Sequence, residues 1–416
     1  PVPFAVTTEP ATIDASMIAP RASFTFSPLC ANCPLISASN VSSSFALTPA
    51  VAESADRRVV GQLGAQIKLA EHQKAQPHPQ GLFHLRVRQL VPLAQQDQLE
   101  HRQWPVRVWA AGAAGFPLVE PDKVLKIPTM ITYALVNRQY MMDIQPDRSV
   151  IRNFLEHGLD CYIVDWGYPT REDMYMTMED YINWYMNDFV DYIIDHSGCP
   201  KINLLGVCQG GTFSSIYTAL HPAKVNALVT MVTPVDFETN DGLLFAWSKS
   251  MDIDSLVDAY GTVPGSLMNI SYLLLKPFDL IVDKYIGFGE KMDDPTYLQN
   301  FLRMEGWIFD SPDQAGETLR QFVKDLYQDN KLVKGDFKLG GETVNLKNIK
   351  CPFLAVVADY DHLVPKAASE PILDAVGSRS KKLLNFPVGH IGMYVSGKSQ
   401  KQIAPQISEW LVNHSA

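Results

Sequence analysis

From about Lys126 to the C-terminus, short apolar runs alternate with longer amphipathic stretches. The apolar runs have the length of strands, so they predict buried strands at 130–136, 160–165, 201–206, 227–232, 351–358 and 381–386. The amphipathic stretches predict helices at 178–196, 212–220 and 403–412. Continuous apolar strands that alternate with helices indicate an α/β fold with a mostly parallel central sheet and helices on both faces.

A different pattern fills the interval between the strand that ends near Thr233 and the strand that starts at Cys351. These more than one hundred residues are rich in Leu, Met, Phe, Tyr and Trp. A connection between a helix and a strand usually takes about 2–6 residues, so this interval is too long to be one. We therefore predict a helical cap at residues 240–340, inserted between the two parts of the core, 116–239 and 341–416.

Residues 1–115 differ from the rest of the chain. Their apolar residues show little regular spacing, apart from a candidate helix at 59–73 and a loosely alternating strand at 82–91. They are also rich in Ala, Ser, Pro and Gln. Two explanations stay open for this atypical segment, namely disorder or a mistranslated stretch. Its CxxC pair, Cys30 and Cys33, has no second pair in the sequence, which favours two incidental thiols over a metal or redox site.

The distribution of charge also separates the two parts of the chain. The 416 residues carry 35 Lys and Arg against 45 Asp and Glu, a net charge of −10. Residues 1–115 hold nine basic and seven acidic side chains, whereas the remainder holds 26 and 38. This balance argues against nucleic acid or an anionic membrane as the main partner. Six cysteines, no long apolar run and no signal-peptide pattern lead us to expect a cytosolic enzyme without a membrane span.

The strongest chemical signal is the segment Gly206-Val-Cys208-Gln-Gly-Gly211, which follows a predicted strand and opens a predicted helix. It matches the nucleophile elbow G-x-S-x-G with cysteine in place of serine. In such an elbow the nucleophile lies on a strained turn, and the N-terminus of the helix favours both a thiolate and a developing oxyanion. A structural glycine turn with a buried cysteine is the alternative, and it explains the strand–turn–helix context less well.

A thiolate nucleophile needs a base and an acid that orients the base, and in the α/β-hydrolase order the acid precedes the histidine. His390 follows the strand predicted at 381–386 and is flanked by glycines, which makes it the candidate base. Asp359 and Asp361 both follow the strand predicted at 351–358. The local pattern favours Asp361 as the acid only slightly.

Cysteine as the nucleophile also bears on the acyl donor. Transfer from a thioester to a cysteine gives another thioester, so little driving force is lost before the acyl group passes to a hydroxyl. We therefore favour acyl transfer from a thioester such as an acyl-CoA, with a cysteine-dependent thioesterase or esterase as the alternative. Cys161, Cys199 and Cys351 are interpreted as structural, and the sequence contains no metal-binding spacing and no GxxxxGK phosphate loop, so no metal and no cofactor are expected.

From about Lys126 to the C-terminus, roughly 290 residues, the chain resembles the polyhydroxyalkanoate (PHA) synthases, in particular the class III type. The residues that carry the resemblance are Ala134-Leu-Val-Asn-Arg138, Tyr140-Met-Met-Asp-Ile-Gln-Pro146, Asp165-Trp-Gly-Tyr-Pro169, the elbow at 206–211, Asp361-His-Leu-Val-Pro365 and Gly389-His-Ile-Gly-Met-Tyr-Val-Ser-Gly397. It implies the α/β-hydrolase fold and the polymerisation of (R)-3-hydroxyacyl-CoA, typically 3-hydroxybutyryl-CoA, into a polyester with release of CoA.

The resemblance also implies roles for single residues. Cys208 would bear the growing chain, His390 would be its base and Asp361 the acid. The backbone N–H groups of Gln209 and Val136 would stabilise the oxyanion. Further implications are a homodimer through the cap, a second synthase subunit (the E subunit of the class III type), and a cytoplasmic location on polyester granules. A non-catalytic granule scaffold is the remaining hypothesis, and it would leave the three candidate catalytic residues without a purpose.

Overall fold

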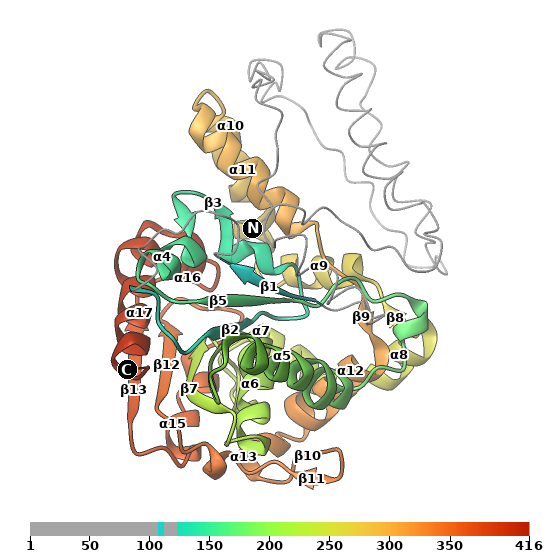
Figure 1. Ribbon diagram of the computed structural model, residues 1–416. Helices are drawn as coiled ribbons and strands as arrows, with labels where there is room; N and C mark the ends of the chain where they lie inside the picture. The colour runs from blue at the N-terminus through green and yellow to red at the C-terminus, as the bar shows by residue number, and fades with distance from the viewer. Residues whose placement is uncertain (1–106, 112–122, 416) are drawn as a thin grey trace, which may run out of the picture. The chain divides into compact units, whose positions relative to one another are not determined.

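The computed structural model describes residues 107–111 and 123–415 of the chain. Its described part contains a seven-stranded sheet with the order β1-β5-β2-β6-β7-β12-β13 (Figure 1). These strands are β1 (Arg107–Ala111), β2 (Thr129–Thr132), β5 (Cys161–Asp165), β6 (Ile202–Val207), β7 (Val225–Met231), β12 (Phe353–Ala358) and β13 (Lys381–Phe386). All pairs are parallel except β1 with β5, which confirms the predicted, mostly parallel sheet.

Strand β1 is the part of this sheet that the sequence pattern did not predict. It lies within the atypical segment 1–115 and pairs with β5 in register, with Arg107 opposite Asp165 and Ala111 opposite Cys161. Strand β1 has five residues and stands at an edge of the sheet. The helix predicted at 59–73, the strand predicted at 82–91 and the CxxC pair all lie outside the described residues.

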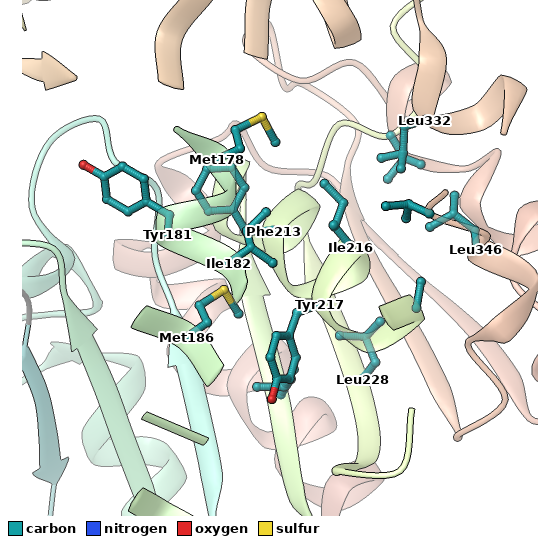
Figure 2. Packing of buried hydrophobic residues seen from close by; sticks show 14 of the residues in the cluster. Met178, Tyr181, Ile182, Met186, Phe213, Ile216, Tyr217, Leu228, Leu332 and Leu346 are labelled. Atoms are coloured by element: carbon teal, nitrogen blue, oxygen red, sulfur yellow. The ribbon is translucent and has the colours of Figure 1, made fainter. Parts of the chain in front are cut away.

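The buried strands are mostly apolar because both faces of the sheet are covered. In β2, Met130 belongs to one hydrophobic cluster and Ile131 to another, and the other central strands alternate in the same way. This alternation sends successive side chains to opposite faces. The first cluster is covered by η7 (Asp180–Met186), α5 (Asn187–Ser197) and α6 (Gln209–Leu220), as Figure 2 shows in part. The second is covered by α4 (Val150–Glu156), α16 (Gly392–Val395) and α17 (Ala404–Asn413).

The longest predicted helix is present as the continuous pair η7 and α5, a π-helical turn followed by an α-helix. It ends at Gly198, whose φ of 69° is the left-handed conformation that stops helices. The shorter elements of the described chain are β3 (Asp143–Gln145), β4 (Arg148–Ser149), β10 (Lys338–Leu339), β11 (Glu342–Thr343), α14 (Lys366–Ser369), α15 (Ile372–Ala375), η5 (Gln139–Met142), η6 (Arg171–Asp173), η10 (Leu346–Asn348) and η11 (Ser399–Ile403).

The region predicted as a cap, residues 240–340, is mainly helical. Its elements are α7 (Leu243–Ser250), α8 (Ile253–Tyr260), β8 (Thr262–Val263), α9 (Gly265–Leu273), η8 (Phe278–Asp283), α10 (Lys284–Lys291), α11 (Pro295–Ile308), β9 (Gln314–Ala315), α12 (Gly316–Gln321), η9 (Phe322–Gln328) and α13 (Lys331–Lys334). Residues 278–302 belong to a compact unit separate from the rest of the cap. Within that unit, Phe301 stacks on Phe288 with ring centroids 4.2 Å apart.

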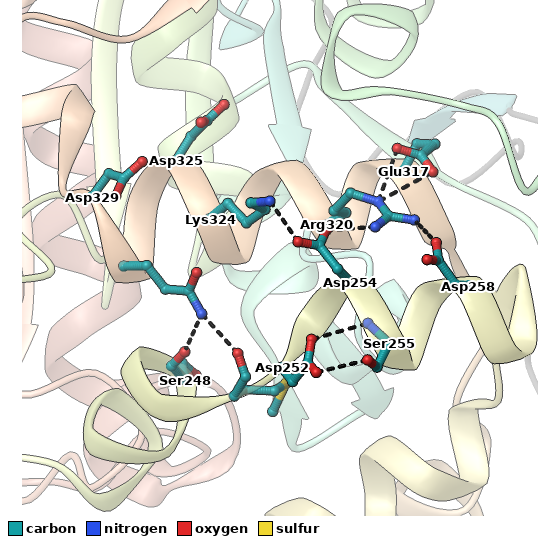
Figure 3. A network of polar contacts seen from close by, with 12 residues as sticks. Ser248, Asp252, Asp254, Ser255, Asp258, Glu317, Arg320, Lys324, Asp325 and Asp329 are labelled. Atoms are coloured by element: carbon teal, nitrogen blue, oxygen red, sulfur yellow. Dashed lines mark hydrogen bonds and ion pairs between the residues drawn. The ribbon is translucent and has the colours of Figure 1, made fainter.

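Helices α8 and α12 of the cap are joined by a small apolar cluster and by an ion-pair network. Figure 3 shows the guanidinium of Arg320 on α12 between Glu317 and the carboxylates of Asp254 and Asp258 on α8. Lys324 adds a second contact to Asp254 at 2.7 Å. Because these groups remain largely accessible to water, each pair stabilises the fold only slightly, and the network mainly fixes the orientation of the two helices.

Candidate active site

Cys208 lies between β6 and α6, in the strand–turn–helix context that the elbow pattern predicts. Its φ of 54° and ψ of −126° are a strained conformation for a residue with a Cβ. The turn is held by the backbone on both sides. The N–H of Cys208 donates to the carbonyl of Met231 at 2.9 Å, and its own carbonyl accepts from the N–H of Gly211 at 2.9 Å.

The glycines around Cys208 allow close approach between α6 and its neighbours. A Cβ on Gly206 would lie 2.7 Å from the Ser214 hydroxyl and would overlap the backbone of Gly211. A Cβ on Gly210 would overlap the carbonyl groups of Thr132 and Tyr133. Helix α6 can therefore press against the loop after β2 only because glycine occupies these positions.

The structure brings Asp361, and not Asp359, against His390. His390 Nδ1 lies 2.6 Å from Asp361 Oδ2, and the Asp361 side chain is 0% exposed. The other carboxylate oxygen accepts N–H groups from the next turn of the loop, those of Leu363 at 2.9 Å and Val364 at 2.8 Å. Asp359 instead pairs with Lys366 at 2.8 Å and accepts from an amide of Asn385 at the surface.

His390 is electrostatically suited to hold a proton beside the nucleophile. Burial disfavours the charged ring, but the charge and hydrogen bond of Asp361, together with a hydrogen bond to Cys208, raise the pKa of His390 to about 10. Because Nδ1 faces Asp361, the other ring nitrogen is left for Cys208. An imidazolium in this place stabilises a thiolate, which is the reactive form of a cysteine. The arrangement can thus generate a nucleophile and return a proton to a leaving group.

Four phenols interact electrostatically with Cys208. Burial raises the pKa values of Tyr133 and Tyr394 above the usual value for a phenol, and the charge of Cys208 acts in the same direction. The same two causes raise the pKa values of Tyr272 on α9 and Tyr327 on η9. These four side chains therefore stay neutral. Because α9 and η9 belong to the cap, core and cap both contribute to the surroundings of Cys208.

The two predicted oxyanion donors lie on segments that touch each other. Gln209 begins α6, and its side-chain oxygen accepts the N–H of Leu135 at 3.1 Å, which ties α6 to the loop that carries Val136. The indole N–H of Trp166 donates to the carbonyl of Tyr133 in the same loop at 2.8 Å. The oxyanion role of both backbone N–H groups stays a prediction, as do the catalytic roles of Cys208, Asp361 and His390.

Sequence reasoning missed a polar cluster next to this loop. Arg138 pairs with Asp165 at 2.8 Å and donates to the carbonyl of Gly167 at 2.6 Å, while its guanidinium lies 4.2 Å from the ring centroid of Tyr168. Asp310 of the cap accepts from the Tyr168 hydroxyl at 2.7 Å. The sequence did contain a signal for this cluster, because the segments that carry the family resemblance include Arg138, Asp165 and Tyr168.

Residues 107–111 and 123–415 contain no group of three or more His, Cys, Asp and Glu side chains that could hold a metal ion. In the same ranges, no helix has the length and apolar character needed to cross a bilayer.

Comparison with known proteins decides the family. A family model described as the alpha/beta hydrolase fold matches residues 141–396. The poly(3-hydroxyalkanoate) polymerase subunit PhaC of Allochromatium vinosum is 54% identical over 297 residues, which are 71% of this chain and 82% of that protein. The chain belongs to the poly(3-hydroxyalkanoate) polymerases of the α/β-hydrolase superfamily. The polymerase is therefore an acyltransferase, and the resemblance drawn from its motifs is confirmed.

Two further PhaC subunits are similar to the polymerase. The protein of Thiocystis violacea is 53% identical over 290 residues, covering 70% of this chain and 82% of its own length. The protein of Synechocystis is 51% identical over 302 residues, covering 71% and 79%. Among solved structures, a thermophilic esterase from Thermogutta terrifontis is 14% identical with a TM-score of 0.45, covering 75% of this chain and 94% of that chain.

Proposed function

We propose that the enzyme polymerises (R)-3-hydroxyacyl-CoA, with 3-hydroxybutyryl-CoA as its main substrate, through a covalent thioester on Cys208. The observation that carries this proposal is the contact of a strained, partly buried elbow cysteine with the His390–Asp361 pair. The family supplies the class of product, since its members are named for the polyester. No cofactor is needed, because the CoA thioester is itself the activated substrate.

The first half of the reaction loads an acyl group onto the enzyme. The Cys208 thiolate attacks the thioester carbonyl, the C–S bond to CoA breaks, and the imidazolium of His390 gives its proton to the departing CoA thiolate. Asp361 accepts the Nδ1 hydrogen bond throughout and keeps the ring in one orientation. The N–H groups of Gln209 and Val136 stabilise the oxyanion of the tetrahedral intermediate.

The second half extends the chain. His390, now neutral, removes the proton from the 3-hydroxyl of another acyl unit, and the resulting oxygen attacks the acyl carbonyl on Cys208. An ester bond forms, the C–S bond to Cys208 breaks, and the thiolate is restored beside the imidazolium. The oxyester product lies lower in free energy than the thioester, so this transfer is downhill.

Exclusion of water favours the hydroxyl acceptor over hydrolysis. His390 is 6% exposed, and the neutral phenols of Tyr133, Tyr272, Tyr327 and Tyr394 surround the nucleophile. An acyl-enzyme in such surroundings meets little water. A cysteine-dependent thioesterase or esterase, which would need water at this site, remains the alternative function.

The proposal extends to partners and location. The relatives are named as subunits, which supports a second synthase subunit of the E type. We also propose a homodimer through the cap and a cytoplasmic location on polyester granules. Size-exclusion chromatography with and without a co-expressed E subunit measures both the homodimer and the complex with that subunit. A monomer that does not bind the E subunit would contradict both proposals.

The test of the function follows thiol release and product together. The full chain, alone and with an E subunit, is incubated with 3-hydroxybutyryl-CoA. Insoluble polyester together with free CoA supports polymerisation, whereas free 3-hydroxybutyrate supports the thioesterase. Cys208→Ala should abolish thiol release, and Cys199→Ala, which changes a partly exposed cysteine outside the site, serves as the matched control. Release of CoA by Cys208→Ala would contradict the covalent mechanism.

A further inference from the structure

The loop after β2 is held from two sides at one residue, Leu135. Its N–H donates to the side-chain oxygen of Gln209, which belongs to the core. Its carbonyl accepts from the side-chain amide of Gln314, which belongs to β9 of the cap, at 3.1 Å. One backbone position therefore takes one hydrogen bond from the core and one from the cap.

The contact with Gln314 fixes the direction of the next N–H. The carbonyl of Leu135 and the N–H of Val136 belong to the same peptide unit. The described chain has no cis peptide bond, and in a planar trans peptide these two groups point in opposite directions. Because Gln314 holds the carbonyl, it also sets the direction in which the N–H of Val136 points.

Gln314 is itself rigidly placed. It is 4% exposed, and its amide also donates to the carbonyl of Pro312 at 3.2 Å. Strand β9 pairs with β8, with Gln314 opposite Val263. The Gln314 side chain has little freedom to rotate, because it is buried, donates to two carbonyls and belongs to a paired strand. It can therefore hold a peptide in one orientation.

Neighbouring contacts dock the same cap segment onto the same loop. Asn137, with φ 56°, donates from its amide to the Ser311 hydroxyl at 2.7 Å and to the carbonyl of Ile308 at 3.1 Å. Ser311 in turn donates to Asn269 on α9, the helix that also carries Tyr272. The loop with the predicted oxyanion donor and the cap helix near Cys208 are thus parts of one hydrogen-bonded assembly.

We propose that Gln314 is a positioning residue for acyl transfer: from the cap, it orients the Leu135–Val136 peptide so that the N–H of Val136 meets the oxyanion formed on Cys208. This inference rests on the proposed function, because it needs an acyl group on that cysteine. According to this proposal, residues of both the core and the cap position the oxyanion donors. The site is complete only while the cap segment is docked on the loop.

The variant Gln314→Met keeps the length of the side chain and removes both donors. Gln328→Met is the matched control, because Gln328 is also a cap glutamine whose amide donates to two carbonyls, those of Ser248 and Met251, and to none of the loop. Thiol release from 3-hydroxybutyryl-CoA should fall about ten- to hundredfold in Gln314→Met, less than the roughly 10²–10³-fold loss measured when an oxyanion donor is removed, because the N–H of Val136 is misdirected and not deleted. It should change less than about twofold in Gln328→Met.

A second readout separates this effect from misfolding. Alkylation of Cys208 by iodoacetamide needs the thiolate but no oxyanion donor, so its rate should stay at the wild-type value in Gln314→Met. A fall in kcat with little change in KM is also expected, because the lost interaction exists only in the transition state. Should Gln314→Met fail to fold, Asn137→Gly tests the same docking, since glycine accepts the positive φ and lacks the amide.

The outcomes distinguish this inference from the proposed function. Unchanged thiol release in Gln314→Met, or an equal loss in Gln328→Met, would overturn the role of Gln314. If the wild-type enzyme releases CoA and forms only free acid, polymerisation is overturned but the role of Gln314 is not. The acyl group is loaded onto Cys208 before either chain extension or hydrolysis, so Gln314 would act in the same step. Equal losses in alkylation and thiol release would also overturn it, since they would place the defect at the nucleophile.

Discussion

Replacement of Asp361 by asparagine tests the electrostatic core of the site. The amide keeps the shape of the side chain and an oxygen that can still accept the N–H groups of Leu363 and Val364. It removes the charge that raises the pKa of His390 to about 10. Only the hydrogen bond and charge of Cys208 then oppose burial, so the pKa of His390 falls. At pH 7.5 the ring is almost fully protonated in the wild type, and its protonated fraction is lower in the variant.

The assay is the rate of Cys208 alkylation by iodoacetamide between pH 6 and pH 10. We expect Asp361→Asn to react about tenfold more slowly than wild type at pH 7.5, because a hydrogen bond to a charged group is worth about 1.5–3 kcal/mol and less imidazolium remains beside Cys208 to stabilise its thiolate. Asp359→Asn is the matched control, because Asp359 lies two residues away and pairs with Lys366 at the surface. An Asp361→Asn profile equal to that of wild type would refute the assignment of Asp361 as the partner that charges His390.

Three further results are expected. The raised pKa of His390 stabilises the fold fully below pH 6.5, and this contribution is lost as the pH rises to about 10. Calorimetry should therefore show a larger fall in Tm between pH 6.5 and pH 10 for wild type than for Asp361→Asn. Parallel curves of Tm against pH would contradict this expectation. The buried Tyr394 hydroxyl has no hydrogen-bond partner among the described residues, so Tyr394→Phe should raise the urea-unfolding free energy by about 1–3 kcal/mol, and a loss of stability would contradict this reading. Gly210→Ala should lower the free energy of unfolding in urea by about 3 kcal/mol or more, because the added Cβ would overlap backbone atoms. Gly397→Ala, with open space around it, should lower it by less than about 1 kcal/mol. Equal losses in the two variants would argue against the close packing of α6.

Local signals account for what the sequence could predict. The elbow was identified because a buried strand, a glycine-flanked cysteine and a helix follow one another within a few residues. Asp361 and Asp359 could not be separated in this way, since both follow the same strand, and only tertiary contact with His390 or Lys366 distinguishes them. Gln314 gave no signal at all, because it meets Leu135 from 179 positions away in the sequence.

Strain at the ends of two adjacent strands shows what the sheet contributes to the site. Cys208 follows β6 with φ 54°, and Val232, a β-branched residue, follows β7 with φ 43°. Such conformations persist only where the surroundings hold them, and here the sheet does so. The N–H of Cys208 donates to the carbonyl of Met231 at the end of β7, and that of Val232 donates to the carbonyl of Val356 in β12 at 2.8 Å. The hydrogen bonds of the parallel sheet therefore hold the strained conformation of Cys208, which explains why the proposed nucleophile follows a central strand and does not lie on a peripheral loop.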